Sequence, residues 1–184
     1  MSYTFSRRDF MKYSAVAAVA VAGSSMFTGC SLISNPNRPT GTIGSTLKPG
    51  SKICNATLLG GDDKPTYTRG VLTCKFDIYT QVSLQINIQH FQVQVIDKDD
   101  KVTYYNIDSG STMSLDPNSN TDYAAGKTVK PTLKATIPNL TDADAVKKIQ
   151  VVYLPKLTAK GKLNDTFSDV YATWEFTPAD LTNA

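Results

Sequence analysis

The chain is poor in the side chains on which most metal and acid–base chemistry depends. Its 184 residues include one histidine, one glutamate and three cysteines, and neither a C-x-x-C nor a G-x-S-x-G motif occurs. A blue-copper site needs a pair of histidines and a cysteine, and a zinc site needs about three or four ligands. We therefore expect no metal and no cofactor, and the sequence supports no catalytic Ser-His-Asp arrangement.

Long apolar runs and an excess of one charge are also lacking. No run of about 18 apolar residues is present, which argues against a permanent membrane span. The formal net charge is only +3. Because charge-driven nucleic-acid binding depends on clustered Lys and Arg, we exclude nucleic acid as a partner. Apolar residues make up 41% of the chain, which is enough to fill a core.

An export signal occupies the N-terminus. Residues 6–12 read Ser-Arg-Arg-Asp-Phe-Met-Lys and resemble the twin-arginine export consensus, with Met in place of Leu. The small apolar residues at 15–23 have the length of a signal-peptide hydrophobic region. The residues that carry the resemblance are Arg7, Arg8, Phe10 and Lys12. It implies that the twin-arginine translocase, which exports folded proteins, is a partner during export.

Two cleavage sites are compatible with this leader. Residues 27–30, Phe-Thr-Gly-Cys, resemble a bacterial lipobox, although Phe27 stands where Leu is usual. This resemblance implies a signal peptide of residues 1–29 and a lipid on Cys30, which would anchor the protein at the cell envelope, facing outside the cytoplasm. The alternative is cleavage after Ala22, which leaves Cys30 as a free thiol. We favour the anchor, because a lone thiol in an exported protein has no other evident use.

Residues 30–51 have the composition of a flexible tether. They are rich in Pro, Gly, Ser, Thr and Asn and show no helical or strand periodicity. A chain of about 20 such residues has a root-mean-square reach of roughly 25 Å. That reach would hold a domain clear of the lipid headgroups.

The segment 52–184 alternates apolar with polar residues, as half-buried β-strands do. The predicted strands lie within 72–78, 82–88, 91–95, 102–104, 129–137, 149–153 and 170–176. Apolar positions change from even to odd numbers around Gln89 and His90, so we expect a bulge or a turn there. The charged stretch 97–101 predicts a hairpin connection, and the alternation around Trp174 places this side chain in the core.

One short helix is expected between two of these strands. Residues 141–144, Thr-Asp-Ala-Asp, offer an N-cap and first-turn carboxylates, and Lys147 and Lys148 would lie near the C-terminal end of the helix. About seven short strands joined by turn-rich loops fit an all-β fold. We therefore predict an antiparallel β-sandwich with one short connecting helix, formed by residues 52–184.

Four segments of this domain carry a family resemblance. They are 125–127 (Ala-Gly-Lys), 135–138 (Ala-Thr-Ile-Pro), 149–153 (Ile-Gln-Val-Val-Tyr) and 174–176 (Trp-Glu-Phe). With them, the stretch from about residue 66 to 178 is similar to the immunoglobulin-like domain of small bacterial lipoproteins of largely unknown function. The resemblance implies an immunoglobulin-like sandwich and, by analogy, a binding or scaffolding role.

Cys54 and Cys74 share strand parity with apolar neighbours, so both are expected to face the interior. An even pair of cysteines in an exported domain favours a disulfide, which would contribute about 3 kcal/mol through chain entropy. The alternative is two separate buried thiols that pack as small hydrophobic side chains. The sequence leaves both open.

Two polar features are expected to be structural. His90 is the only histidine, so we expect it to support the strand break rather than a metal. Asp97, Asp99 and Asp100 lie in one turn and could offer oxygens to Ca²⁺. The EF-hand pattern is absent and two lysines share the turn, so a solvated hairpin turn is the better interpretation.

The polar connection 108–127 is longer than compact domains usually need, and long loops are often functional. We expect aromatic and apolar residues in and near it to form a recognition surface, since Tyr gives amphipathic contacts at low entropic cost. These residues are Tyr104, Tyr105, Met113, Leu115 and Tyr123. The alternative is a disordered insertion.

Together these features predict a non-enzymatic, lipid-anchored, extracytoplasmic binding or scaffold module. It would present sandwich loops to a protein, peptide or glycan partner. The alternative function is an accessory subunit of an exported redox enzyme complex, because the twin-arginine route often carries folded cofactor proteins. Against it stands the lack of any cofactor-ligand set in this chain.

Overall fold

The computed structural model describes residues 38–142, 144–157 and 170–183, and this part of the chain is all-β, as predicted. The predicted signal peptide, Cys30 and the first part of the predicted tether lie outside the described residues. The described strands number sixteen, more than the seven expected. No helix in the described part of the chain has the length and apolar character needed to cross a membrane.

The strands are β1 (Thr40–Gly41), β2 (Thr46–Leu47), β3 (Cys54–Leu58), β4 (Thr66–Thr68), β5 (Val71–Thr80), β6 (Leu84–Ile86), β7 (Phe91–Asp97), β8 (Val102–Tyr105), β9 (Met113–Asp116), β10 (Ser119–Tyr123), β11 (Thr128–Val129), β12 (Thr132–Thr136), β13 (Val146–Tyr153), β14 (Lys156–Leu157), β15 (Ala172–Phe176) and β16 (Thr182–Asn183). Short 3₁₀ turns are η1 (Gly61–Asp63), η2 (Ile88–His90), η3 (Ile107–Ser109) and η5 (Pro178–Asp180).

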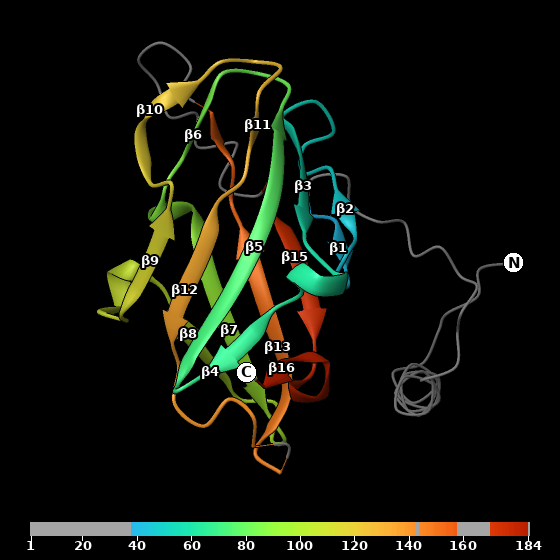
Figure 1. The fold of residues 1–184 in the computed structure, drawn as a ribbon, viewed down its shortest axis with the longest axis vertical. Coiled ribbons are helices and arrows are strands. Elements are labelled where there is room, and N and C mark those ends of the chain that lie inside the picture. Colours follow the sequence, from blue (N-terminus) through green and yellow to red (C-terminus); the bar gives the residue numbers. More distant parts are fainter. Residues whose placement is uncertain (1–37, 143, 158–169, 184) are drawn as a thin grey trace, which may run out of the picture. The chain divides into compact units, whose positions relative to one another are not determined.

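The described strands form three sheets. A five-stranded sheet has the order β1-β15-β13-β7-β8, an eight-stranded sheet is built around β5, and a three-stranded sheet has the order β10-β6-β14 (Figure 1). Pairing is antiparallel except for two short parallel pairs, β1 with β15 and β16 with β4. The second of these places the C-terminal strand beside β4, at the end of β5 where that strand begins.

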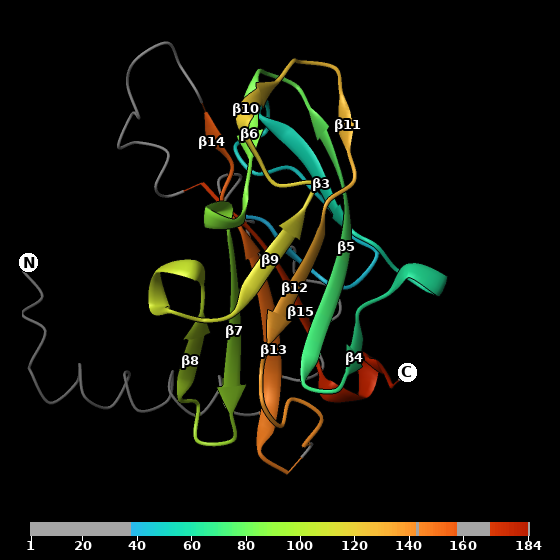
Figure 2. The same ribbon diagram turned by 60° about the vertical axis from the view of Figure 1, so that its left-hand side comes forward.

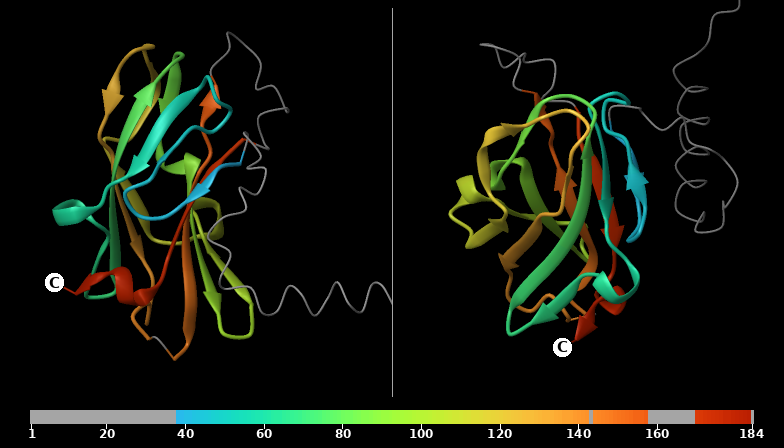
Figure 3. Two further views of the ribbon diagram at one scale, coloured as in Figure 1. Left: turned by 90° about the vertical axis from the view of Figure 1, so that its right-hand side faces the viewer. Right: turned by 45° about the horizontal axis from the view of Figure 1, so that its top comes forward.

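The core lies between the five-stranded and eight-stranded sheets. Even-numbered residues of β5 are buried and odd ones are half-buried or exposed, as the alternation predicts. The Phe76 ring of β5 lies 5.3 Å from that of Phe91 in β7 and 5.5 Å from that of Trp174 in β15. Trp174 is fully buried, which confirms its predicted place in the core. Figures 2 and 3 show β5 and the β7–β8 hairpin on opposite sides of this core.

A turn separates β6 from β7, where the apolar positions change parity. Residues 88–90 form η2, and the Asn87 side chain accepts a 3.1 Å hydrogen bond from the backbone N–H of Gln89. The chain thereby leaves the three-stranded sheet and enters the five-stranded sheet. The predicted turn is confirmed, and His90 is buried in it.

The helix predicted at 141–148 is wrong for the residues that the structure describes there. The Asp142 side chain accepts hydrogen bonds from the N–H groups of Asp144 and Ala145, as a capping residue does. β13 then begins at Val146, within one turn, and pairs with β7 and β15 on its two sides. Pairing and burial along β13 outweigh the local helical preference.

The tether prediction is wrong from residue 38 to 51. β1 pairs with β15 and β2 pairs with β3, and Leu47 is buried in the core. Between these strands the chain turns at Gly44, whose φ of +84° favours glycine. Two-residue strands are too short to produce visible periodicity, so composition alone suggested a linker.

The connection 108–127 contains two strands. β9 extends the eight-stranded sheet by pairing with β12, and β10 pairs with β6. The expectation of an uninterrupted loop is therefore wrong, and so is the alternative of a disordered insertion. Its polar residues face outward while Leu115 enters the core.

Candidate functional site

The outer face of the five-stranded sheet carries an unusual set of uncharged polar side chains. In β7 the inward residues are Phe91 and Val93, so Gln92 and Gln94 face outward. Gln94 is paired with Gln150 of β13 on one side and with Tyr104 of β8 on the other. Since paired residues share a face, Gln150 and Gln94 form a row across neighbouring strands, with Tyr104 at its end. We call this row the amide row.

A shallow hollow of about 370 Å³ lies over this face. This volume falls near the lower end of the range of roughly 300–1,000 Å³ that is usual for small-molecule sites. Its lining residues are Arg38, Thr40, Gln92, Gln94, Gln150, Val152, Leu154, Tyr171 and Thr173. Val152 and Thr173 are each 6% exposed and form the floor.

The amide side chains at this face are held by hydrogen bonds. Nε2 of Gln94 donates to Oε1 of Gln92 at 2.7 Å. Nε2 of Gln150 donates to Oε1 of Glu175, whose other oxygen accepts a 2.9 Å hydrogen bond from Nζ of Lys148. The single glutamate of the chain is thus paired with a cation and an amide, so the sheet face presents fixed amides with little net charge.

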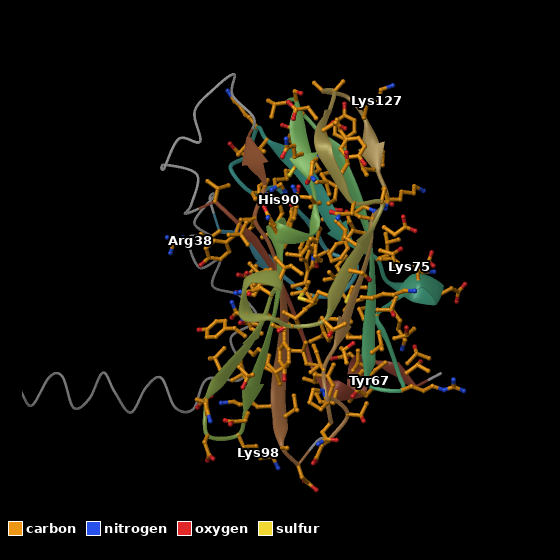
Figure 4. The ribbon with its side chains drawn as sticks, turned by 90° about the vertical axis from the view of Figure 1, so that its left-hand side faces the viewer. Arg38, Tyr67, Lys75, His90, Lys98 and Lys127 are labelled. Atoms are coloured by element: carbon orange, nitrogen blue, oxygen red, sulfur yellow. The ribbon has the colours of Figure 1, made fainter. Side chains whose placement is uncertain are left out.

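An aromatic ring and a cation border the hollow on the side away from Gln94. The guanidinium carbon of Arg38 lies 5.2 Å from the ring centroid of Tyr171, a cation–π contact. Arg38 precedes β1, and Tyr171 directly precedes β15. In Figure 4 Arg38 and Lys75 of β5 project from opposite sides of the molecule. The hollow and the outer face of the eight-stranded sheet are therefore separate surfaces.

The described lining of the hollow is suited to hydrogen bonding. Among its described lining residues are amides, hydroxyls and a guanidinium, and no histidine, cysteine or carboxylate. Throughout the described residues there is no group of three or more His, Cys, Asp or Glu side chains placed to hold a metal ion. The site can orient a polar ligand through its donors and acceptors.

The predicted Cys54–Cys74 disulfide is absent, and both cysteines are free buried thiols. Cys54 of β3 is paired with Thr80 of β5, while Cys74 lies six residues before Thr80 on the same strand. At about 3.3 Å per residue their Cα atoms are roughly 20 Å apart, far beyond the reach of a disulfide. The prediction that both face the interior is confirmed.

Burial makes these thiols unreactive. It raises the pKa of Cys54 from its usual 9.0 to about 12, and raises that of Cys74 further. The pKa of Tyr153 is also raised well above its usual value, by burial and then by the nearby Cys54. Since the thiolate is the reactive form, neither cysteine is a candidate nucleophile.

The five residues predicted to form a recognition surface do not come together on one. Leu115 is buried, and Tyr105, Met113 and Tyr123 pack partly against the core. Burial and the nearby Tyr67 raise the pKa of Tyr105. Tyr104 is 53% exposed and shares the sheet face with Gln94. None of the five is among the lining residues of the hollow, but Tyr104 is paired with one of them, Gln94.

The acidic turn is a hairpin between β7 and β8, as predicted. Oδ1 of Asp97 accepts 2.9 Å hydrogen bonds from the N–H groups of Asp99 and Lys101. Asp100 forms an ion pair with Lys147 of β13. Asp97 thus stabilises the turn, and Asp100 links the turn to β13.

Sequence reasoning missed the three glutamines of the hollow. Residues 89–95 read Gln-His-Phe-Gln-Val-Gln-Val, so amides alternate with the apolar residues of β7. That alternation was the available signal, but it identifies only an outward face. In the folded chain β7 pairs with β13, which places Gln150 beside Gln94. β13 also pairs with β15, which brings Tyr171 nearby. No local pattern reveals these pairings.

Comparison with known proteins identifies the leader. Residues 4–24 match the TAT (twin-arginine translocation) pathway signal sequence. The chain carries a twin-arginine signal. The match confirms the predicted export signal and indicates that the twin-arginine translocase exports the protein across the cytoplasmic membrane.

The folded part has a distant similarity to a solved structure. The yjhA protein from Bacillus subtilis is 19% identical, with a TM-score of 0.44, and the match covers 73% of this chain and 98% of that one. No curated protein matches the chain.

Proposed function

We propose that this protein is a non-enzymatic binding module that works outside the cytoplasm and holds its ligand on the outer face of the five-stranded sheet. The observation that supports this most directly is the composition of the hollow. Three of the six glutamines in the chain line it, and they come from two strands paired side by side. Pockets with a few convergent polar groups are the usual form of a binding site.

The sheet face is better suited to this role than the loops. Long amides are less favoured on a solvated strand than β-branched residues, so fold stability alone gives little reason for them. By contrast, side chains of the β7–β8 hairpin already form ion pairs with neighbouring residues, Asp100 with Lys147 and Lys98 with Asp144. The partner, a protein, peptide or glycan, would meet the amide row rather than the loop ends.

The proposal includes an immunoglobulin-like β-sandwich and a lipid on Cys30. Face-to-face packing of two mainly antiparallel sheets supports the first. The lipobox-like residues 27–30, directly after the twin-arginine signal, support the second. An anchor at Cys30 would keep the module at the cell envelope while its sheet face stays free for a ligand.

The six glutamines provide a built-in test. The full chain is labelled with ¹⁵N in the glutamine side-chain amides and titrated with soluble material extracted from the cell envelope. We expect the amide signals of Gln92, Gln94 and Gln150 to shift. The signals of the remaining three serve as internal controls, since none lines the hollow; they belong to Gln81, Gln85 and Gln89.

The opposite pattern would contradict the proposal. If envelope material moves only the control amides, the ligand binds elsewhere. If no amide shifts at any concentration of extract, the hollow is not a binding site for envelope components. Conversion of the added material to product would contradict the non-enzymatic part of the proposal.

A further inference from the structure

We infer that the ligand is a neutral oligosaccharide, an uncharged chain rich in hydroxyl groups. The inference rests on the proposed function, because it names the ligand class for the same sheet face. It follows from three properties of the site: its charge, its pattern of donors and acceptors, and its aromatic border.

The charge of the site favours an uncharged ligand. Glu175, at the edge of the amide row, is neutralised by Lys148 at 2.9 Å. Of the described residues that line the hollow, Arg38 alone is charged, and its guanidinium stacks on Tyr171. Anion sites usually gather several cations or oriented N–H groups on one point, and the residues described on this face do not do so.

The amides offer donors and acceptors side by side. One hydrogen bond joins Gln92 to Gln94, which leaves an N–H donor on one side chain and a carbonyl acceptor on the other, whichever way the two amides are turned. Gln150 is fixed by Glu175 and keeps its own carbonyl oxygen. A sugar hydroxyl both donates and accepts, so each of these groups can be matched.

Fixing the amides before binding lowers the cost of binding. A glutamine side chain loses roughly 1–2 kcal/mol of rotamer freedom when it is immobilised. Gln94 and Gln150 have already lost part of this freedom through their partners Gln92 and Glu175. Pre-organised polar groups are the general route to affinity for a ligand with little apolar surface.

Tyr104 supplies an aromatic surface at the end of the row. It is exposed, and its pairing with Gln94 places it one strand away, at a spacing of about 4.8 Å. The C–H face of a sugar ring can pack on such a ring while its hydroxyls meet the amides. The row Glu175, Gln150, Gln94, Tyr104 spans four strands, so an extended ligand lying across the strands fits it.

An extended peptide fits this face less well. A peptide normally binds a sheet by pairing with the backbone of an edge strand. At the hollow the backbones of β7 and β13 are already paired with strands on both sides. A peptide laid over the side chains would leave many of its own backbone groups without partners, at a cost in free energy.

The test uses the protein purified after export, together with defined probes. Immobilised neutral hexose and N-acetylhexosamine oligosaccharides are compared with uronic-acid oligosaccharides and with extended peptides. We expect binding to the neutral oligosaccharides and little change at high salt, because no ion pair is involved. The best neutral probe is then titrated calorimetrically against the variants.

Each variant has a matched control. We expect Gln94→Ala and Gln150→Ala to weaken binding of the neutral probe about tenfold each, as for loss of one buried hydrogen bond, and Tyr104→Ala to weaken it similarly. Gln89→Ala and Tyr79→Ala remove an exposed amide and an exposed tyrosine that do not line the hollow, so they should bind as the wild type does.

The outcomes separate the ligand class from the site. Preference for acidic oligosaccharides or peptides, weakened by Gln94→Ala, would overturn the inference and leave the proposed site intact. Binding of a neutral oligosaccharide that neither Gln94→Ala nor Gln150→Ala changes would overturn both. If no neutral oligosaccharide binds, the inference is wrong, and the glutamine amide titration then decides the proposed function.

Discussion

The indole nitrogen of Trp174 donates a 2.9 Å hydrogen bond to the backbone carbonyl oxygen of Ser45. The two residues are 129 positions apart in the chain. The bond joins the β1–β2 segment to the centre of the core. It explains how residues with the composition of a linker become part of the folded domain.

Replacement Trp174→Phe tests this connection. It removes the donor, leaves the Ser45 carbonyl without its partner and shrinks a fully buried side chain. We expect the free energy of unfolding to fall by about 2–4 kcal/mol, measured by urea denaturation. Tyr104→Phe removes only an exposed hydroxyl and should stay within about 0.5 kcal/mol of the wild type. Equal stabilities for Trp174→Phe and Tyr104→Phe would refute the contribution of the bond.

Alkylation tests the separation of the two core cysteines. Without reductant, the folded chain should leave Cys54 and Cys74 unmodified at neutral pH, because both are buried and protonated. In denaturant, still without reductant, both should react, which mass spectrometry of the peptides shows. If they become reactive only after reduction, they are bridged and the pairing of β3 with β5 is incorrect.

The same thiols predict a loss of stability at alkaline pH. In the unfolded chain they lose their protons near pH 9.0, whereas in the folded chain burial raises the pKa of Cys54 to about 12 and that of Cys74 further. Above pH 9.0 the folded state therefore binds more protons, so its stability is full below that pH and falls as pH rises. The expected slope is about 1.4 kcal/mol per pH unit for each thiol.

Urea denaturation with reductant, from about pH 7.5 to 10.5, measures this slope. The double variant Cys54→Ala, Cys74→Ala should show a much flatter dependence, with a remaining decline at the highest pH from Tyr153, whose pKa is also raised. A wild-type stability that stays constant across this range would contradict the burial of the thiols.

Fractionation tests the lipid anchor. We expect the wild type in the membrane fraction after export and Cys30→Ala in the soluble exported fraction, because the acyl chains supply the attachment. Both should be exported, since Arg7 and Arg8 are unchanged. A Lys–Lys replacement of these two arginines is the control for the export route. Soluble exported wild type would rule out the anchor.

Local patterns predicted the longest strands well. The alternation in residues 72–78 and 91–95 predicted β5 and β7. The change of the apolar positions from even to odd numbers predicted the turn at His90. The same patterns failed where long-range pairing decides. Val146 begins a strand because β7 and β15 flank it, although Asp142 provides a capping interaction.

The site was harder to predict than the fold. The glutamines of β7 could be assigned to an outward face from sequence, but their neighbours come from pairings that no local pattern reveals. Tyr104 and Tyr105 illustrate this, since adjacent strand residues face opposite ways and only the first is exposed beside the row. Composition also grouped Leu115 with them, although the register of β9 on β12 buries it.

Hydroxyl-radical footprinting of the full chain, with and without bound envelope material, tests most directly whether the ligand lies on the sheet face. The account predicts protection of Tyr104 and Tyr171, which border the amide row, and no change at Tyr79 on the eight-stranded sheet. Protection of Tyr79 or of the 97–101 hairpin, with Tyr104 and Tyr171 as reactive as in the free protein, would contradict it.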